Sequence, residues 1–387
     1  MFHVDASRWL LPISMVFATT HADADVIFVP GDHETINGAI EASSNGDIIQ
    51  VDPGVYFENL VVNNKRIAIR GGYPSGDTVI DGSSAKGSFR SCVLVTGNSD
   101  LVLDRMVLRN GGGSSVYGIT RGGGLYAEYA VLELIDVTIE ACSVEAEPFG
   151  EPSWGGAICN YGGSMVLDRC LIRDNRSDGE GGGIWTTQGT VLMANSLITG
   201  NASRDGGGLH AEGGSVSVDL STFHDNLADE HGGAIMARSG VDLSIYDSRF
   251  ASNRARDGAA LWSSVPQGVI EFATFERQVA EAEVGGAAIR LADLSLAGAE
   301  YLIGGSVFCG TIGPDITGAW VEGLPNVFDK ICPLPGDLDR NGLVDGADLT
   351  LLLAEWGTAG VAIGADLDFS GLVDGGDLTR LLGTWSN

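Results

Sequence analysis

Two acidic stretches near the C-terminus carry the residue types that bind calcium. Each stretch places oxygen-bearing side chains at positions 1, 3, 5, 9 and 12 of a twelve-residue loop, with a backbone carbonyl available at position 7. The residues are Asp337, Asp339, Asn341, Leu343, Asp345 and Asp348 in the first loop, and Asp366, Asp368, Ser370, Leu372, Asp374 and Asp377 in the second. Calcium takes about six to eight hard oxygen ligands, and glycine at position 6 (Gly342, Gly371) permits the sharp turn. The second loop begins 366 − 337 = 29 residues after the first, so the sequence predicts a C-terminal module with two Ca²⁺ ions.

A second group of residues has the types needed for acid–base chemistry on a sugar. Asp205, His231 and Asp257 follow one another at steps of 26 residues, each just before a glycine. On adjacent strands of one sheet such residues would lie about 5 Å apart, close enough for an acid and a base to flank a sugar. The candidate catalytic residues are Asp205, Glu230, His231, Arg256 and Asp257. The alternative is a solvated, salt-bridged loop that does no chemistry.

A neighbouring row predicts sugar contacts. Its members are Tyr126, Cys159, Trp185, His210, Met236 and Trp262. Outward aromatic rings can stack on sugar rings, so Trp185, His210 and Trp262 are the candidate substrate-binding residues, and Glu212 adds a titratable group beside His210. The alternative is that a loop covers this face and buries the aromatic residues.

A sequence repeat puts the acid–base candidates and the sugar-contact row at the same positions of successive coils. A glycine-rich pattern, Gly-Gly-(Gly/Ala)-(Ile/Leu) in most copies, recurs with steps of 33, 26, 25, 26 and 26 residues. The copies end at Leu125, Ile158, Ile184, Leu209, Ile235 and Leu261. A period of this length indicates a solenoid, and alternating apolar residues such as Val216, Val218 and Phe223 predict short strands whose inward side chains stack. Four asparagines fall at one corner, where they should tolerate left-handed geometry and chain their amides along the axis: Asn175, Asn201, Asn226 and Asn253.

Two stretches near the start carry a family resemblance. Residues 35–42 (TINGAIEA) are followed by residues 45–56 (NGDIIQVDPGVY), and residues 67–72 and 78–82 continue the pattern. Over about residues 26–330 the chain resembles the pectin-lyase-like, right-handed parallel β-helix superfamily. The resemblance implies an all-β solenoid whose core is capped by an amphipathic helix that buries Ile36, Ala39 and Ile40.

The acidic loops also carry a resemblance. Aspartate at position 12, where an ordinary EF-hand has glutamate, and a single helix after each loop are similar to the dockerin family. This resemblance implies a small α-helical, EF-hand-like module that folds with calcium and binds a cohesin-like protein. Dockerin positions 10 and 11 help select that partner, and here they are Gly346-Ala347 and Gly375-Gly376 instead of the familiar Ser/Thr pairs.

Composition limits the setting. The formal net charge of −29 disfavours nucleic acid and anionic membranes as partners. An apolar run from Trp9 to Phe17 with small residues at 22 and 24 predicts a secretory signal over residues 1–24, and no later run approaches transmembrane length. We therefore expect a secreted or cell-surface protein with a β-helix over residues 25–332 and the dockerin-like module over residues 333–387.

Cys309 and Cys332 flank one irregular segment and are the favoured disulfide. The other four cysteines, Cys92, Cys142, Cys159 and Cys170, are either buried thiols or include a second pair.

Three functions fit these patterns. The first is a secreted β-helix that recognises extracellular polysaccharide and is tethered through the dockerin-like module. The second is a polysaccharide lyase or glycoside hydrolase docked by that module. The third is a structural or adhesive surface protein.

Overall fold

The structure is a computed structural model of the chain. It describes residues 24–72, 76–84, 89–146, 152–281, 287–292, 300–330, 332, 336–339, 343–358, 365–367 and 372–385. The predicted signal segment, apart from its last residue, lies outside this range. Three of the predicted calcium ligands, Asn341, Asp368 and Ser370, also lie outside it.

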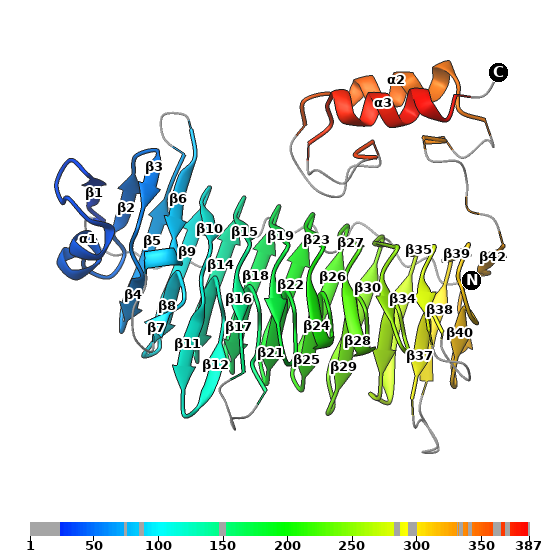
Figure 1. The fold of residues 1–387 in the computed structure, drawn as a ribbon, viewed down its shortest axis with the longest axis horizontal. Coiled ribbons are helices and arrows are strands. Elements are labelled where there is room, and N and C mark those ends of the chain that lie inside the picture. The colour runs from blue at the N-terminus through cyan, green and yellow to red at the C-terminus, as the bar shows by residue number, and fades with distance from the viewer. Residues whose placement is uncertain are drawn as a thin grey trace.

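The described part of the chain winds into a long solenoid of stacked parallel strands (Figure 1). A twelve-stranded sheet contains β1 (Val26–Val29), β2 (Ile48–Val51), β5 (Arg66–Arg70), β9 (Asp100–Asp104), β14 (Val131–Ile135), β18 (Ser164–Asp168), β22 (Thr190–Ala194), β26 (Ser215–Asp219), β30 (Asp242–Tyr246), β34 (Gln267–Glu271), β38 (Glu300–Gly304) and β41 (Val321–Glu322). An eleven-stranded sheet contains β3 (Gly54–Tyr56), β6 (Thr78–Asp81), β10 (Val107–Arg109), β15 (Thr138–Glu140), β19 (Leu171–Arg173), β23 (Leu197–Thr199), β27 (Thr222–His224), β31 (Arg249–Ala251), β35 (Thr274–Glu276), β39 (Val307–Cys309) and β42 (Val327–Asp329).

Two further parallel sheets complete the coils. A ten-stranded sheet contains β4 (Leu60–Asn63), β8 (Val93–Thr96), β13 (Leu125–Glu128), β17 (Ile158–Tyr161), β21 (Ile184–Thr187), β25 (Leu209–Glu212), β29 (Ile235–Arg238), β33 (Leu261–Ser263), β37 (Ile289–Leu291) and β40 (Ile316–Thr317). A six-stranded sheet contains β16 (Ser143–Val144), β20 (Arg176–Ser177), β24 (Ala202–Asp205), β28 (Leu227–His231), β32 (Arg254–Ala255) and β36 (Val279–Ala280). A small antiparallel sheet of β7 (Phe89–Arg90), β11 (Gly113–Val116) and β12 (Ile119–Arg121) is set beside them.

The core is made by the alternating residues that the repeat predicts. Val216 and Val218 of β26 pair in register with Leu243 and Ile245 of β30, and all four are at most 2% exposed. Phe223 is fully buried. Its ring begins an inward ladder in which each ring stacks on the next: Phe223, Phe250, Phe275, Phe308 and Phe328. A coil alone could not bury this face, so stacking of coils supplies the core.

The predicted asparagine corner is present. The side-chain amides of Asn175, Asn201 and Asn226 each donate to the side-chain oxygen of the next asparagine at 3.0 Å. The same oxygens accept backbone N–H groups, so the amides satisfy polar groups that this turn would otherwise leave unpaired. The left-handed conformation lies one residue earlier than expected, for example at Asp174 and Asp225, with φ of 56° and 50°. The asparagine itself is free to point its amide inward.

The glycine corner needs glycine for space as well as for backbone conformation. Gly206 has a φ of +67°. A Cβ on Gly207 would lie 2.4 Å from the carbonyl oxygen of Gly233 in the next coil, so a side chain would push the coils apart.

Both ends of the solenoid are specialised. Helix α1 (Ile36–Ala42) begins at the N-cap Thr35 and buries Ile36, Ala39 and Ile40 over the first coils, as the sequence predicts. At the other end a disulfide joins Cys309 and Cys332, the pair that the sequence favoured. The remaining cysteines, Cys92, Cys142, Cys159 and Cys170, are buried free thiols.

The C-terminal module has two helices, α2 (Gly346–Ala354) and α3 (Gly375–Gly383), and its own small core. Val344, Leu352, Val373 and Leu381 are fully buried in that core. The two helices pack side by side (Figure 1). Among the described residues no helix is long and apolar enough to cross a membrane.

Candidate functional site

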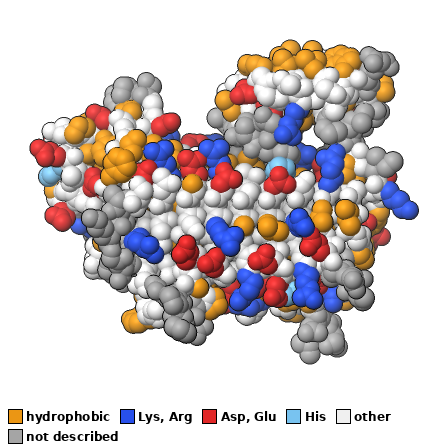
Figure 2. All heavy atoms as spheres, viewed as in Figure 1, with side chains coloured by type: hydrophobic (Ala, Val, Ile, Leu, Met, Phe, Trp, Pro, Cys, Tyr) orange, Lys and Arg blue, Asp and Glu red, His pale blue; other side chains and the backbone are white. Residues whose placement is uncertain are grey.

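The charged residues singled out by the repeat lie along one outer edge of the solenoid. We call Arg121, Trp154, Glu180, Asp205, His231 and Asp257 the corner row, because each precedes a glycine corner and pairs with the next. The adjacent strand row, on the ten-stranded sheet, contains Tyr126, Cys159, Trp185, His210, Met236, Trp262 and Arg290. Figure 2 shows acidic and basic side chains interspersed along this edge, over the stretch where Figure 1 places β25, β28 and β29.

The aromatic end of the strand row is closed to solvent. Trp185 is 2% exposed, and its ring stacks on Trp154 with the ring centroids 4.4 Å apart. The guanidinium of Arg121 lies over the other face of this cluster, 4.8 Å from the Trp154 centroid. The expectation that Trp185 is an open platform for a sugar is therefore wrong. The alternative, in which a loop covers this face and buries the aromatic residues, describes this end of the row, because Val116 of the hairpin strand β11 packs against the cluster together with Trp154 of the corner row.

Glu180 is the centre of the charged part of the site. Its side chain is 8% exposed. Its Oε2 accepts the indole N–H of Trp185 at 3.1 Å, and its Oε1 accepts Nη2 of Arg238 at 2.9 Å. Arg204 lies 3.5 Å from the same Oε1. A buried carboxylate needs such partners, and here they come from its own coil and from the next two coils.

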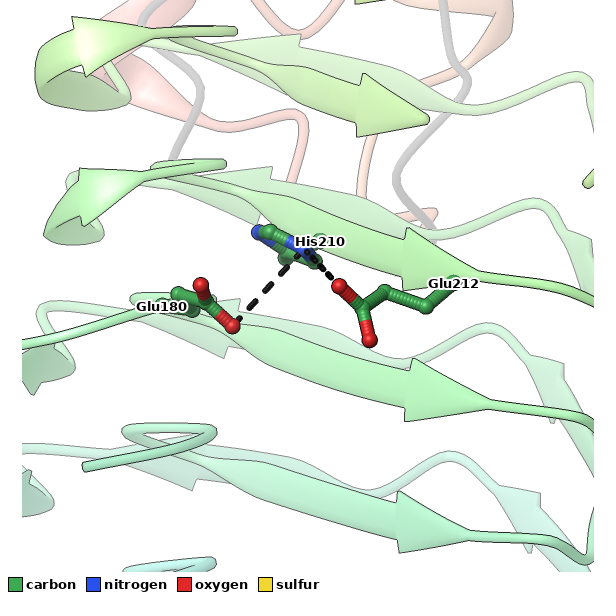
Figure 3. Close-up of side chains that lie close together, drawn as sticks. All are labelled: Glu180, His210 and Glu212. Carbon is green, nitrogen blue, oxygen red and sulfur yellow. Dashed lines mark ion pairs between the residues drawn. The ribbon is translucent and has the colours of Figure 1, made fainter. Parts of the chain in front are cut away.

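His210 lies beside Glu180 and is completely buried (Figure 3). Its Nε2 is 3.8 Å from Oε2 of Glu180 and 3.7 Å from Oε1 of Glu212. Neither ring nitrogen has a hydrogen-bond partner among the described residues. Like Trp185, His210 is therefore unavailable for stacking on a sugar ring.

Glu212 closes the cluster on the solvent side. Its Oε1 also accepts Nε of Arg238, which joins Glu180 and Glu212 through one guanidinium. The imidazole of His210 holds the pKa of Glu212 below its ordinary value; burial opposes this shift and Arg238 reinforces it. The carboxylate is therefore ionised.

The middle of the corner row is an aspartate–histidine pair. Asp205 and His231 are register partners across a bulge between β24 and β28, and Nδ1 of His231 donates to Oδ1 of Asp205 at 2.9 Å. Burial alone would raise the pKa of Asp205, but His231 and Arg204 lower it. The hydrogen bond to Asp205 raises the pKa of His231, against the opposing effect of burial.

The last member of the corner row has different electrostatics. Burial raises the pKa of Asp257, although Arg290 lies 3.4 Å away and opposes the shift. Trp262 is half-buried, and its ring lies 5.2 Å from that of His231. Of the predicted catalytic residues, the structure thus brings Asp205, His231 and Asp257 into one line, whereas Glu230 and Arg256 are exposed neighbours.

Several residues of this site did not stand out in the sequence. Glu180 stands before Gly181 as Asp205 stands before Gly206, so the repeat alignment alone could have found it. Arg238 and Arg290 lie on strands β29 and β37 and carry no such signature. They belong to the site because their long side chains reach across to Glu180 and Asp257.

The acidic loops of the C-terminal module form a second cluster. In the first loop, one carboxylate oxygen each from Asp337, Asp339 and Asp348 lies within 4.8 Å of the others. Asp348 is fully buried and accepts the backbone N–H groups of Leu338 and Asp339 at 2.6 and 3.1 Å. Asp377, the equivalent residue of the second loop, is also buried and accepts the N–H of Leu367 at 2.6 Å. Residues at positions 1 and 12 are therefore close together in both loops.

Comparison with known families agrees with this architecture. Residues 67–255 match the family model described as "Right handed beta helix region". None of the curated proteins matches the sequence. Together, the family match and the long parallel sheets show that the main part of the chain is a right-handed parallel β-helix.

Proposed function

We propose that this protein recognises extracellular polysaccharide along the edge formed by the corner and strand rows, and that its C-terminal module is a calcium-dependent, dockerin-like tether. A right-handed β-helix region points to a polysaccharide-related protein. The observation that carries the proposal is the open half of the two rows, where cationic, acidic and aromatic groups recur at the spacing of the coils. Its half-buried groups are His231, Trp262 and Arg290 of the rows, with Arg204 and Arg238 beside them.

These groups are held in place before any ligand arrives. Arg204 pairs with Asp205 at 3.0 Å, Arg238 with Glu180, and Arg290 with Asp257. Side chains fixed in this way lose little conformational freedom when they donate to sugar hydroxyl groups. Trp262 beside His231 adds a ring on which a sugar can stack. Because Arg204, Arg238 and Arg290 each already have an acidic partner, we favour a neutral or mixed glycan over a dense polyanion.

Binding without turnover is the better supported activity. Asp205, whose pKa is lowered, and His231, whose pKa is raised, are engaged with each other. A general base needs a free lone pair that reaches the substrate, and neither group offers one while the pair is intact.

The proposal that the C-terminal module is a calcium-dependent tether is based on its acidic loops. Asp337, Asp339 and Asp348 supply hard oxygens from loop positions 1, 3 and 12, which suits Ca²⁺. Three converging carboxylates repel one another without a cation, so metal binding should stabilise the loop. The ion would order the module, and the exposed side chains of α2 and α3 would be free to meet a cohesin-like partner. We propose that the protein acts outside the cell, in agreement with the leader-like N-terminus and the disulfide.

Retention on an array of plant and algal polysaccharides tests the binding proposal. The full chain should be retained on at least one glycan, and Trp262→Ala or Arg290→Ala should weaken retention at least about tenfold, because each removes a side chain from the open half of the rows. Tyr117→Ala is the control, since Tyr117 is 93% exposed in the turn between β11 and β12, beside the closed aromatic end of the rows and outside their open half. Equal loss in all three variants, or no retention on any glycan, would count against the proposal and leave a structural or adhesive role.

A second candidate function is a polysaccharide lyase or glycoside hydrolase, and Asp257 is the residue that favours it. Its raised pKa is the property that a general acid needs, and it is in register with His231. If the protein is a lyase or hydrolase, incubation with the retained glycan should release unsaturated or reducing ends. Asp257→Asn would then abolish release and leave retention intact, whereas the exposed Glu230 could be changed to Gln without effect. Release that survives Asp257→Asn would remove this candidate.

A further inference from the structure

We propose that Glu180, His210 and Glu212 form a site for a divalent transition-metal ion of the zinc type, separate from the acidic loops. This inference does not depend on glycan binding. The three residues come from two adjacent coils: Glu180 stands just before β21, and His210 and Glu212 lie on β25. One ligand atom from each lies within 4.8 Å of the others.

The imidazole of His210 is the observation that points to a ligand. It is 0% exposed, it faces the two carboxylates in Figure 3, and neither of its nitrogens has a hydrogen-bond partner among the described residues. A buried polar group without a hydrogen bond destabilises the fold, so a bound ion would satisfy an imidazole that otherwise has only two long contacts to carboxylates.

The distances from Nε2 of His210 to the two carboxylate oxygens fit ligands of one ion better than hydrogen bonds. The gaps of 3.8 and 3.7 Å from Nε2 to the carboxylate oxygens are too long for hydrogen bonds. Zinc binds nitrogen and oxygen at about 2.0–2.2 Å, which places neighbouring ligand atoms roughly 3.3–3.6 Å apart in a tetrahedral site. A shift of a few tenths of an ångström would bring Nε2 and either carboxylate oxygen to the spacing of two ligands on one ion. The two carboxylate oxygens, which lie within 4.8 Å of each other, would have to approach by up to about 1 Å.

Groups around the cluster already hold the two carboxylates. The indole N–H of Trp185 donates to Oε2 of Glu180 at 3.1 Å, and Arg238 donates to Oε1 of Glu180 at 2.9 Å and to Glu212. Ligating carboxylates in metal sites are usually hydrogen-bonded in this way, which fixes their orientation. Trp185, buried against Trp154, therefore acts as a positioning residue for Glu180.

The type of metal follows from the donors. One imidazole with two carboxylates suits zinc and its neighbours in the first transition row, whereas calcium prefers oxygen donors alone. The oxygen-only cluster of Asp337, Asp339 and Asp348 is the contrasting case in the same chain. The two sites should therefore be distinguishable by the metal that they take.

The competing explanation is a protonated His210 that pairs directly with the two glutamates. That arrangement needs no metal and would bind none. Titration of the full-length protein with Zn²⁺, after chelation and with calcium in excess to fill the acidic loops, separates the two explanations. Calorimetry should show one zinc site in the wild-type protein, together with a rise in the melting temperature.

Variants locate that site. His210→Gln and Glu212→Gln should each weaken zinc binding at least about 100-fold, and His224→Gln, a histidine on β27 outside the cluster, should leave it unchanged. Trp185→Phe keeps an aromatic side chain but removes the indole N–H that holds Glu180, and should weaken zinc binding about 10–100-fold. Absence of the zinc heat, or a heat that persists in both His210→Gln and Glu212→Gln, would overturn the proposal. Glu212 is on the solvent side, so Glu212→Gln gives a folded test even if His210→Gln does not fold.

Discussion

At the scale of single residues, the partners and the burial of each side chain determine how its pKa is shifted. Asp205 and His231 form an ion pair, since the pKa of Asp205 is lowered and that of His231 is raised. Asp257 is the next residue of the corner row after His231, and burial raises its pKa. The pKa values of neighbouring groups on one edge are thus shifted in different directions, because the adjacent coils supply them with different partners.

The pair predicts a pH dependence. A raised pKa in the folded state means that the stabilisation from His231 is fully present below its ordinary value of 6.5 and is lost as the pH rises through the folded pKa. The lowered pKa of Asp205 keeps its part of the stabilisation until the pH falls through that lower value. His231→Gln should therefore lower the melting temperature at about pH 5.5 and have a smaller effect at about pH 9. The opposite order, or an equal effect at both values, would contradict the assignment. His224→Gln is the contrasting variant: burial lowers the pKa of His224, so its loss should not lower the melting temperature more at about pH 5.5 than at about pH 9.

At the scale of elements, the repeat determined what could be predicted. The inward residues of β26 and β30 and the asparagine corner were predicted from spacing, because each coil presents the same position to the same neighbour. The cap helix α1 was predicted from the family resemblance. The burial of Trp185 could not be read in this way. It depends on Trp154, at a corner-row position where the neighbouring coils have Arg121 and Glu180, and on Val116 of the hairpin strand β11. Contacts made by insertions have no counterpart in the other coils, so the repeat carries no signal for them.

The asparagine corner supplies a stability prediction. Asn226 donates to Asn253 and to the carbonyl of Ile198, and its oxygen accepts two N–H groups of Asn201. Asn226→Ala would leave several of these groups buried and unpaired, at about 1–3 kcal/mol each. We expect a loss of roughly 2–4 kcal/mol in denaturant unfolding. Asn63→Ala, at an exposed asparagine, should change stability by less than about 0.5 kcal/mol. Similar losses in both variants would show that the ladder contributes little.

At the scale of the whole molecule, the chain combines a β-helix with a module that has its own core. The core of the β-helix spans many coils, whereas the module buries a handful of residues such as Leu352 and Leu381. Small cores of this kind usually need a metal or a disulfide. The module should therefore depend on calcium, and the β-helix should not.

Chelation tests this division. Scanning calorimetry of the full chain should show two transitions in calcium, and a chelator should remove the one that belongs to the module and leave the other in place. Asp337→Ala combined with Asp366→Ala should reproduce the chelated trace without a chelator and abolish the binding of two calcium ions. A chain that shows no calcium heat would refute the dockerin-like assignment.

The most direct measurement for the central proposal is hydroxyl-radical footprinting of the full chain with and without a retained polysaccharide. Oxidation of Trp262 should fall several-fold in the complex, because a sugar on the open half of the rows would cover its ring, whereas oxidation of the exposed Tyr117 should not change. A complex that forms and leaves Trp262 as reactive as before would contradict the proposed position of the binding surface.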